Sequence, residues 1–135
     1  MYVGKSITVN RLVTGEDIER YAFISGDYNP LHVNKDFAEK SQFGEQIVQG
    51  NLIIGWLTGM IATNFPGPGA LLVSQEMRFR SPVFINSDIE LRLTLYKHIE
   101  RAGILYMSAQ CVSREILCVD GSFKVYRTDI ELKHD

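Results

Sequence analysis

Apolar and polar residues alternate through much of the second half of the chain. The clearest case lies between residues 89 and 95, where the apolar positions are Ile89, Leu91, Leu93 and Leu95. A period of two is typical of a strand that buries one face. Similar patterns predict strands over residues 73–80, 104–112 and 116–132, and a further strand over residues 3–12.

The last of these apolar runs is interrupted by Asp120-Gly121. This dipeptide is common in two-residue hairpin turns, and it can also form a bulge inside one long strand. Because residues 122–126 continue the apolar alternation, we expect a bulge rather than a hairpin.

Two short helices are predicted in the first third of the chain. Thr14 is a suitable N-cap, apolar residues recur at helical spacing over 18–22, and Gly26 is suited to the end of the helix. Asn34 can cap a second short helix.

Residues 47–65 contain no charged side chain and predict a long apolar helix that begins near Val48. Such a stretch is long enough to cross a membrane. Several polar residues dilute it, however, and no basic residue lies close to it, so we expect a helix buried in the protein core. Gly55 and Gly59 are then expected to permit the close approach of a neighbouring element.

The predicted order is a strand, two short helices, a long helix and then three or four antiparallel strands. One face of such a sheet must cover the apolar helix. We therefore predict one α+β domain over residues 1–135, with an antiparallel β-sheet wrapped round a long central helix. Because one helix leaves much apolar surface open, we also expect two subunits to pair.

Composition narrows the possible functions. The 135 residues carry a formal net charge of −2, so the chain has no basic surplus for binding nucleic acid. Residues 1–6 show no apolar run typical of a secretion signal, and we expect a cytoplasmic protein without a membrane anchor. Cys111 and Cys118 lack metal-site spacing, so we expect two reduced thiols and no metal site.

The candidate chemistry lies between the two short helices, where Asp27, Asn29 and His32 fall within six residues around Pro30. Adding water to a conjugated double bond needs one group to take a proton and another to give one. An imidazole suits the first task, and a carboxyl group in an apolar pocket can serve the second. Asn29 can orient the water. Each residue could equally be structural, because Asn-Pro is common in turns.

The same segment resembles the characteristic motif of the MaoC-like (R)-specific enoyl-CoA hydratases, also called hydratase 2. That motif contains Gly-Asp-x-Asn-Pro, an aliphatic residue and His, with an aromatic residue upstream and a small residue downstream. Every position is filled here, by Tyr21, Ile24, Ser25, Gly26, Asp27, Asn29, Pro30, Leu31, His32 and Ala38. The resemblance implies a hot-dog fold over nearly the whole chain.

The resemblance also implies site residues. Asp27 and His32 would be the catalytic pair, with His32 as base and Asp27 as acid, and Asn29 would be a further site residue. The backbone N–H of Gly50, at the start of the central helix, would bind the thioester carbonyl. Many family members read His-Gly-Met where this chain has Gln49-Gly50-Asn51, so the pocket lining is expected to differ.

The expected reaction is reversible hydration of a trans-2-enoyl thioester of coenzyme A to the (R)-3-hydroxyacyl thioester, without a cofactor. The same residues could serve a dehydratase acting on acyl-carrier-protein thioesters or on branched or dicarboxylic acyl-CoAs. A thioesterase is less favoured, because residues 47–65 contain no carboxylate. A non-catalytic acyl-thioester-binding module is a further alternative. We expect a homodimer or a dimer of dimers.

Two arginines on a predicted strand are further candidates. Arg78 and Arg80 could contact a phosphate of coenzyme A, but their alternation with apolar residues is typical of a solvated strand face, which is the interpretation that we favour.

Overall fold

A computed structural model describes residues 2–127 of the chain. Its five strands form one antiparallel sheet in the order β1-β3-β4-β5-β2. The strands are β1 (Ser6–Leu12), β2 (Ala70–Phe79), β3 (Asp88–Ile99), β4 (Ile104–Ser113) and β5 (Ile116–Arg127). Part of the last predicted strand, residues 128–132, lies outside the described residues.

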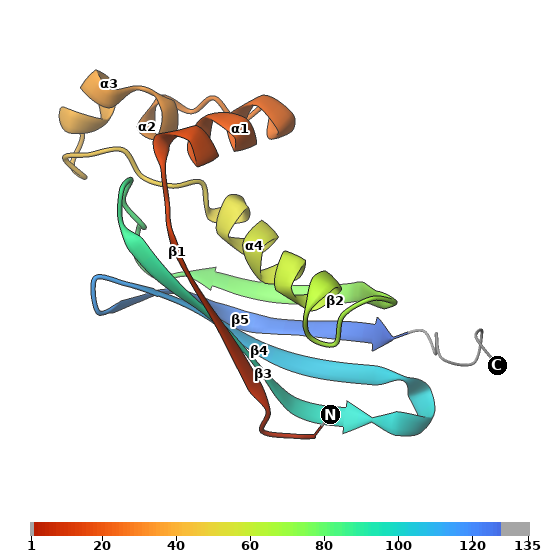
Figure 1. Ribbon diagram of the computed structural model, residues 1–135. Coiled ribbons are helices and arrows are strands. Elements are labelled where there is room, and N and C mark those ends of the chain that lie inside the picture. The colour runs from red at the N-terminus through yellow and green to blue at the C-terminus, as the bar shows by residue number, and fades with distance from the viewer. Residues whose placement is uncertain (1, 128–135) are drawn as a thin grey trace.

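The longest helix lies along one face of the sheet, and three shorter ones gather beyond its N-terminal end (Figure 1). The helices are α1 (Gly15–Ser25), α2 (Pro30–Val33), α3 (Lys35–Glu39), α4 (Gly50–Thr63) and the 3₁₀ turn η1 (Glu100–Ala102). This arrangement confirms the predicted α+β hot-dog fold, in which a sheet packs round a central helix.

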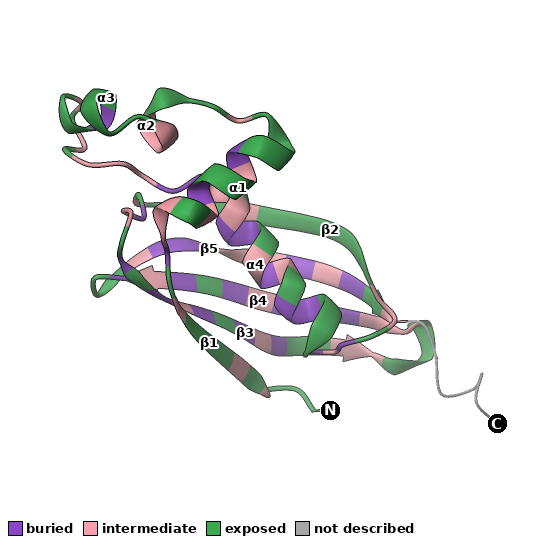
Figure 2. Cartoon of the chain, turned by 45° about the horizontal axis from the view of Figure 1, so that its top comes forward, coloured by how far each residue is buried: buried purple, intermediate pink, exposed green. Residues whose placement is uncertain are grey.

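The core lies between α4 and the sheet (Figure 2). The alternation over residues 89–95 is confirmed, because its apolar side chains are all at most 2% exposed. α4 contributes Ile53, Leu57 and Ile61 to the same core. The period of two along β3 and the helical period along α4 therefore meet at one apolar interface.

The short helices begin where their capping residues predict. Thr14 Oγ1 accepts a hydrogen bond from the Asp17 N–H at 3.2 Å, and Asp17 Oδ2 accepts one from the Thr14 N–H at 2.9 Å. These two bonds form a complete capping box at the start of α1. Asn34 caps α3 in the same way, because its Oδ1 accepts a hydrogen bond from the Phe37 N–H at 2.9 Å.

The prediction of one continuous strand through Asp120-Gly121, rather than a hairpin, is confirmed, but the bulge predicted at these two residues is wrong. β5 runs straight through these residues, and Gly121 pairs with Ala109 on one side and Met77 on the other. The extra residue is Cys118, which has no partner in the register that β5 makes with β4. Gly121 serves another purpose, because a Cβ atom there would lie 2.1 Å from the carbonyl oxygen of Glu76 in β2.

α4 is less deeply buried than we expected. Gly55 and Gly59 lie on its exposed face, and nothing within the described chain comes within 4 Å of a Cβ atom built at either position. The expectation that they let a neighbouring element approach is therefore wrong for residues 2–127. No helix in this part of the chain is long and apolar enough to cross a membrane.

Candidate active site

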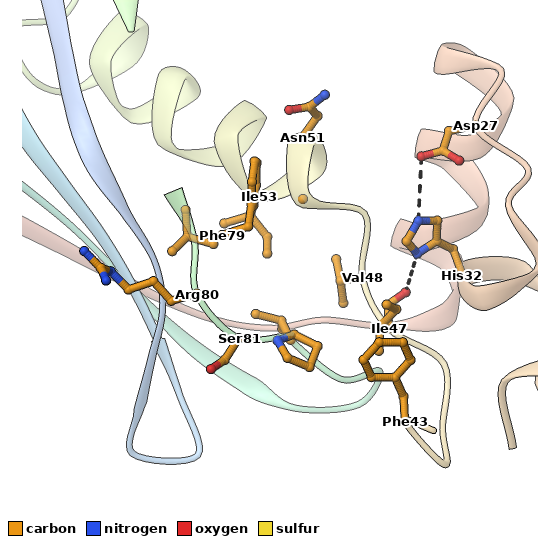
Figure 3. Close-up of a pocket in the computed structure, with 14 residues that line it drawn as sticks. Asp27, His32, Phe43, Ile47, Val48, Asn51, Ile53, Phe79, Arg80 and Ser81 are labelled. Atoms are coloured by element: carbon orange, nitrogen blue, oxygen red, sulfur yellow. Dashed lines mark hydrogen bonds and ion pairs between the residues drawn. The ribbon is translucent and has the colours of Figure 1, made fainter. Parts of the chain in front are cut away.

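A cavity of about 450 Å³ opens between the loop after α1, the first turn of α4 and the end of β2 (Figure 3). Its polar wall residues are Asp27, His32, Asn51, Arg80 and Ser81. Its other wall residues are Phe43, Ile47, Val48, Gly50, Ile53, Phe79, Pro82, Val83 and Val119. A mostly apolar wall with a few polar groups suits a ligand that is largely apolar and has one reactive end.

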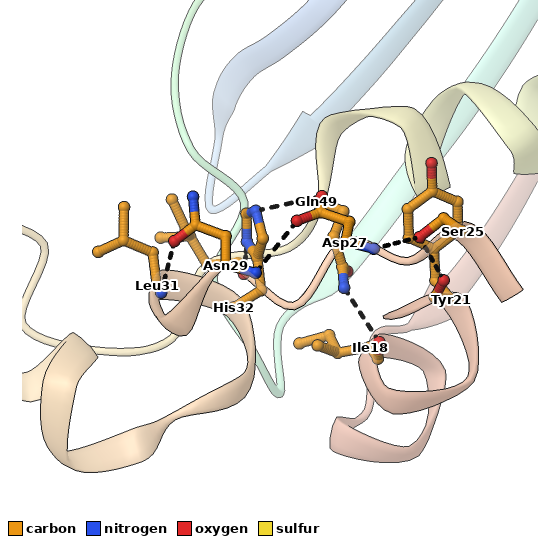
Figure 4. A network of polar contacts seen from close by, with 9 residues as sticks. Ile18, Tyr21, Ser25, Asp27, Asn29, Leu31, His32 and Gln49 are labelled. Carbon is orange, nitrogen blue, oxygen red and sulfur yellow. Dashed lines mark hydrogen bonds and ion pairs between the residues drawn. The ribbon is translucent and has the colours of Figure 1, made fainter. Parts of the chain in front are cut away.

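The end of α1 holds Asp27 at the edge of this cavity. Gly26 ends the helix in the left-handed conformation, with φ 81°, and its N–H donates to Ala22 O at 2.8 Å. The Asp27 N–H donates to Ser25 Oγ at 3.1 Å, and the Asp27 carboxylate accepts from the Asn29 N–H at 3.2 Å. These local bonds fix a carboxylate that is 41% exposed (Figure 4).

The imidazole of His32 has a defined orientation. Its Nδ1 lies 2.8 Å from the carbonyl oxygen of Ile47, which can only accept, so Nδ1 carries the hydrogen. In the neutral ring the lone pair is therefore on Nε2, which lies 3.8 Å from Asp27 Oδ2. His32 belongs to the one-turn helix α2, a helix that the sequence analysis did not predict. The site thus sets a proton acceptor beside a carboxyl group.

Asn29 does not line the cavity. Its Oδ1 accepts a hydrogen bond from the Leu31 N–H at 3.0 Å and so caps α2, which begins at Pro30. Its own N–H holds the Asp27 carboxylate. The structure therefore brings Asp27 and His32 together at the cavity and places Asn29 in the turn that joins them.

The first turn of α4 forms another part of the wall. Gly50 begins the helix, and its N–H makes no hydrogen bond within the described residues. The first turn also contains no acidic side chain. Unpaired N–H groups and the positive end of the helix dipole favour a partly negative oxygen at this position.

The end of β2 and the residue after it also line the cavity, with Phe79, which the sequence analysis did not single out, and Arg80, which it named as a candidate. The side chains of Arg78 and Arg80 are 52% and 48% exposed, as expected of a solvated strand face, and Arg80 also lines the cavity whereas Arg78 does not. Arg80 Nε donates to Asp120 Oδ1 at 2.9 Å, and this bond raises the pKa of Arg80. The same bond and the nearby charge of Arg78 hold the pKa of Asp120 below its ordinary value.

The fold and the cavity together define a hot-dog protein in which a carboxyl group and an imidazole lie beside a helix N-terminus. The (R)-hydratase of A. caviae has the same fold, with a TM-score of 0.91, 24% identity and coverage of 95% of this chain and 98% of that one. The (R)-specific enoyl-CoA hydratase of Rhodospirillum rubrum is 29% identical over 90% of this chain and 85% of its own length.

A plant relative is more similar in sequence. The mitochondrial 3-hydroxyacyl-acyl-carrier-protein dehydratase of Arabidopsis thaliana is 35% identical over 88% of this chain and 73% of its own length. The model of the MaoC-like domain matches residues 3–113. The chain therefore belongs to the MaoC-like domain family and is a hydratase or dehydratase of that type.

Proposed function

We propose that the protein adds water to trans-2-enoyl thioesters, giving (R)-3-hydroxyacyl thioesters, and that it also catalyses the reverse reaction. The observation that carries the proposal is the meeting of three groups at one cavity. These are the Nε2 atom of His32, the carboxyl group of Asp27 and the first turn of α4 at Gly50. A mostly apolar wall then accommodates the acyl chain.

In the proposed reaction His32 acts as the base. Its Nε2 removes a proton from water as the water oxygen bonds to C3 of the enoyl group. The electrons of the C2–C3 double bond move toward the thioester, and its carbonyl oxygen becomes enolate-like. The free N–H of Gly50 stabilises that oxygen, where negative charge develops.

Asp27 completes the addition. Its carboxyl group gives a proton to C2, and the double bond of the thioester carbonyl re-forms. The protonated imidazole of His32 then returns a proton to the Asp27 carboxylate across the Nε2–Oδ2 contact of 3.8 Å, which restores the starting state. Asn29 contributes by fixing the turn that joins Asp27 to α2, through its bonds to Asp27 and Leu31.

The substrate is proposed to be a coenzyme A thioester. The resemblance and the Rhodospirillum rubrum relative, named as an enoyl-CoA hydratase, support this choice. The plant relative is named as a dehydratase of acyl-carrier-protein thioesters, so the same chemistry on a carrier protein is the second candidate. Both candidates use the same groups at the same cavity.

We also propose that two copies of the chain pair through β2. This strand is an edge of the sheet and carries three consecutive exposed apolar residues, Leu71, Leu72 and Val73, which are 46–56% exposed. An apolar edge of this kind is a template for pairing with another strand. Since β2 ends at the cavity wall with Phe79, the pairing would place a second subunit beside the site.

The proposed reaction is tested by following the loss of the conjugated-thioester absorbance. The substrates are short and medium enoyl-CoAs and the corresponding carrier-protein thioesters. Asp27→Asn and His32→Ala should each lower kcat by about a hundred- to ten-thousand-fold. Asp36→Asn and His98→Ala, which change the same residue types away from the cavity, should retain activity.

Two outcomes would contradict the proposal. One is undiminished turnover by the Asp27 and His32 variants. The other is an unsubstituted chain that is inactive on every thioester but still binds them, which would favour the non-catalytic binding module. The stereochemistry of the product is tested separately, by asking whether an (R)-specific hydroxyacyl dehydrogenase oxidises it.

A further inference from the structure

Gln49 is a polar residue in an apolar place. It is 1% exposed, does not line the cavity, and its Nε2 donates to the carbonyl oxygen of Ile18 in α1 at 3.0 Å (Figure 4). Its Oε1 is also buried and has no hydrogen-bond partner within residues 2–127. An unpaired buried amide oxygen is destabilising because its lost hydration is not replaced by a hydrogen bond, so an apolar side chain of the same length would fill the space more favourably.

Gln49 is also the N-cap residue of α4, but its side chain does not cap the helix. The other three α-helices of the described chain are capped by the side chains of Thr14, Asn29 and Asn34. A capping oxygen would lie in front of the first turn of α4, where it would compete with a ligand oxygen. With the carboxamide turned toward α1 instead, the first turn stays open to the cavity.

The residues before Gly50 are attached to three different parts of the fold. The carbonyl oxygen of Ile47 accepts the Nδ1–H of His32 at 2.8 Å, and the Val48 N–H donates to Val83 O at 2.8 Å. Gln49 supplies the third attachment, to α1. α1 ends just before Asp27. The Gln49 bond therefore connects the helix that precedes Asp27 to the residue that precedes Gly50.

We propose that Gln49 is a positioning residue: its bond to Ile18 turns the carboxamide away from α4 and fixes the Gly50 N–H relative to the Asp27–His32 pair. This inference rests on the proposed function, because it assigns a purpose to an N–H group that binds the thioester carbonyl. Gln49 touches neither the substrate nor the cavity, so its effect is exerted through Gly50.

Gln49→Met tests the inference, because methionine keeps the length of the side chain and removes both polar atoms. The bond to α1 is then lost, while Ile18 O keeps the donor of its own helix. We expect the variant to fold. Its kcat should fall about ten- to a hundredfold, because a small displacement of the Gly50 N–H from the reacting groups can lower the rate by that factor. KM should change less than about threefold, because the interaction with Gly50 strengthens mainly in the transition state.

Ser87→Ala is the matched control, since Ser87 is also buried, does not line the cavity, and has an Oγ atom without a hydrogen-bond partner among residues 2–127. It should leave kcat unchanged. Gln49→Leu provides a second variant in which both polar atoms are missing, and it should behave as Gln49→Met does.

A spectroscopic measurement separates positioning from mere stability. Bound 2,4-hexadienoyl-CoA absorbs at longer wavelength when its carbonyl oxygen accepts a strong hydrogen bond, and Asp27→Asn can be used to prevent turnover. We expect the red shift to be present in Asp27→Asn and reduced when Gln49→Met is added. An unchanged red shift and kcat, with only a lower Tm, would overturn the inference.

Failure of the proposed function would look different. If the unsubstituted chain neither hydrates enoyl thioesters nor shifts the absorbance of the dienoyl probe, the proposed reaction is wrong and the role of Gln49 falls with it. If the unsubstituted chain does both and Gln49→Met matches it, only the role of Gln49 is wrong.

Discussion

The aromatic ring of Phe79 lies against the Cα atom of Gly50, so that a Cβ atom at Gly50 would come within 2.4 Å of Cε1 of the ring. The contact joins the last residue of β2 to the first residue of α4. Both residues line the cavity, and Phe79 is 57% exposed. Only glycine at position 50 leaves the ring in this place.

Gly50→Ala should therefore displace the ring into the cavity instead of unfolding the chain. We expect a loss of about 1–3 kcal/mol in stability, which is typical of overpacking. We also expect kcat/KM to fall on the order of ten- to a hundredfold, because the donor and its surroundings are shifted. Thermal denaturation and steady-state kinetics measure the two effects.

Phe79→Leu supplies the control for this prediction. Since leucine lacks the ring atoms that meet the new methyl group, the double variant should be less destabilised than the sum of the two single variants. Strictly additive losses would show that the contact between ring and glycine is not the cause.

Gly121 allows the backbones of β5 and β2 to approach each other closely. A Cβ atom at Gly121 would meet backbone atoms of β2, namely Glu76 O at 2.1 Å and Met77 Cα at 2.8 Å. Because backbone cannot move aside as a side chain does, Gly121→Ala should destabilise the protein by more than about 2 kcal/mol in urea denaturation. Gly15→Ala, where the nearest atom is Ile85 Cδ1 at 3.6 Å, should change stability by less than about 1 kcal/mol.

The strands and caps could be predicted because their signals are local. Thr14 with Asp17 identifies the start of α1, and the alternation over residues 89–95 identifies a half-buried strand. The roles of Gly121 and Cys118 could not be predicted in this way. They depend on which strand lies beside β5 and in which register, and β2 is about forty residues away in the sequence.

The residues of the candidate site also differ in whether local sequence signals could predict them. Asp27 and His32 are five residues apart, in the turn before α2 and in α2 itself, so their meeting follows from local geometry. Phe79 and Arg80 reach the same cavity only because β2 ends beside the start of α4. No pattern near those residues predicts that contact, and the free side-chain oxygen of Gln49 becomes visible only when its surroundings are known.

The contribution of Asp120 to the stability of the folded protein should decrease in acid. Its pKa is lowered in the folded protein by its hydrogen bond with Arg80, by Coulomb attraction to Arg80 and Arg78, and by a hydrogen bond with Arg78. A lowered carboxyl pKa stabilises the fold above the unfolded value of about 3.9 and loses that effect as pH falls through the folded value. The unfolding midpoint of Asp120→Asn should thus lie below that of the unsubstituted chain at neutral pH, and the two should converge as the pH falls through the folded pKa of Asp120.

Urea denaturation between neutral pH and about pH 2.5 measures this convergence. A difference between the two proteins that stays constant over the whole range would contradict the assignment, because it would have to come from packing instead of charge.

The thiols should be inert in the folded protein. Burial, with a smaller contribution from Cys118, raises the pKa of Cys111 to about 12, and burial also raises the pKa of Cys118. Since the thiolate is the reactive form, a disulfide reagent at about pH 8 should modify neither cysteine until the chain is unfolded. The absorbance of the released chromophore, measured with and without denaturant, reports how fast the cysteines react. Rapid reaction in the native protein would contradict the prediction.

The β2 edge can be tested by introducing a charge. Val73→Lys places a lysine on the apolar edge and should shift sedimentation equilibrium from dimer to monomer, because edge lysines oppose strand pairing. Val9→Lys makes the same change on β1, the opposite edge of the sheet, and should leave the dimer intact. A dimer that survives the first change and dissociates with the second would place the interface on β1.

The short segment from Ile47 to Gly50 contacts His32, the proposed base, at its first residue and offers the proposed N–H donor at its last. The bulky wall residues Phe43 and Phe79 come from other segments. In the proposed reaction, the two phenylalanines that would contact the acyl chain are thus encoded apart from the reacting groups, whereas Ile47 and Val48 of the cavity wall belong to the same segment as Gly50. Substitutions at Phe43 would then alter which acyl group fits without replacing a reacting group, so one chemistry can be adapted to other substrates by changing a side chain of the wall.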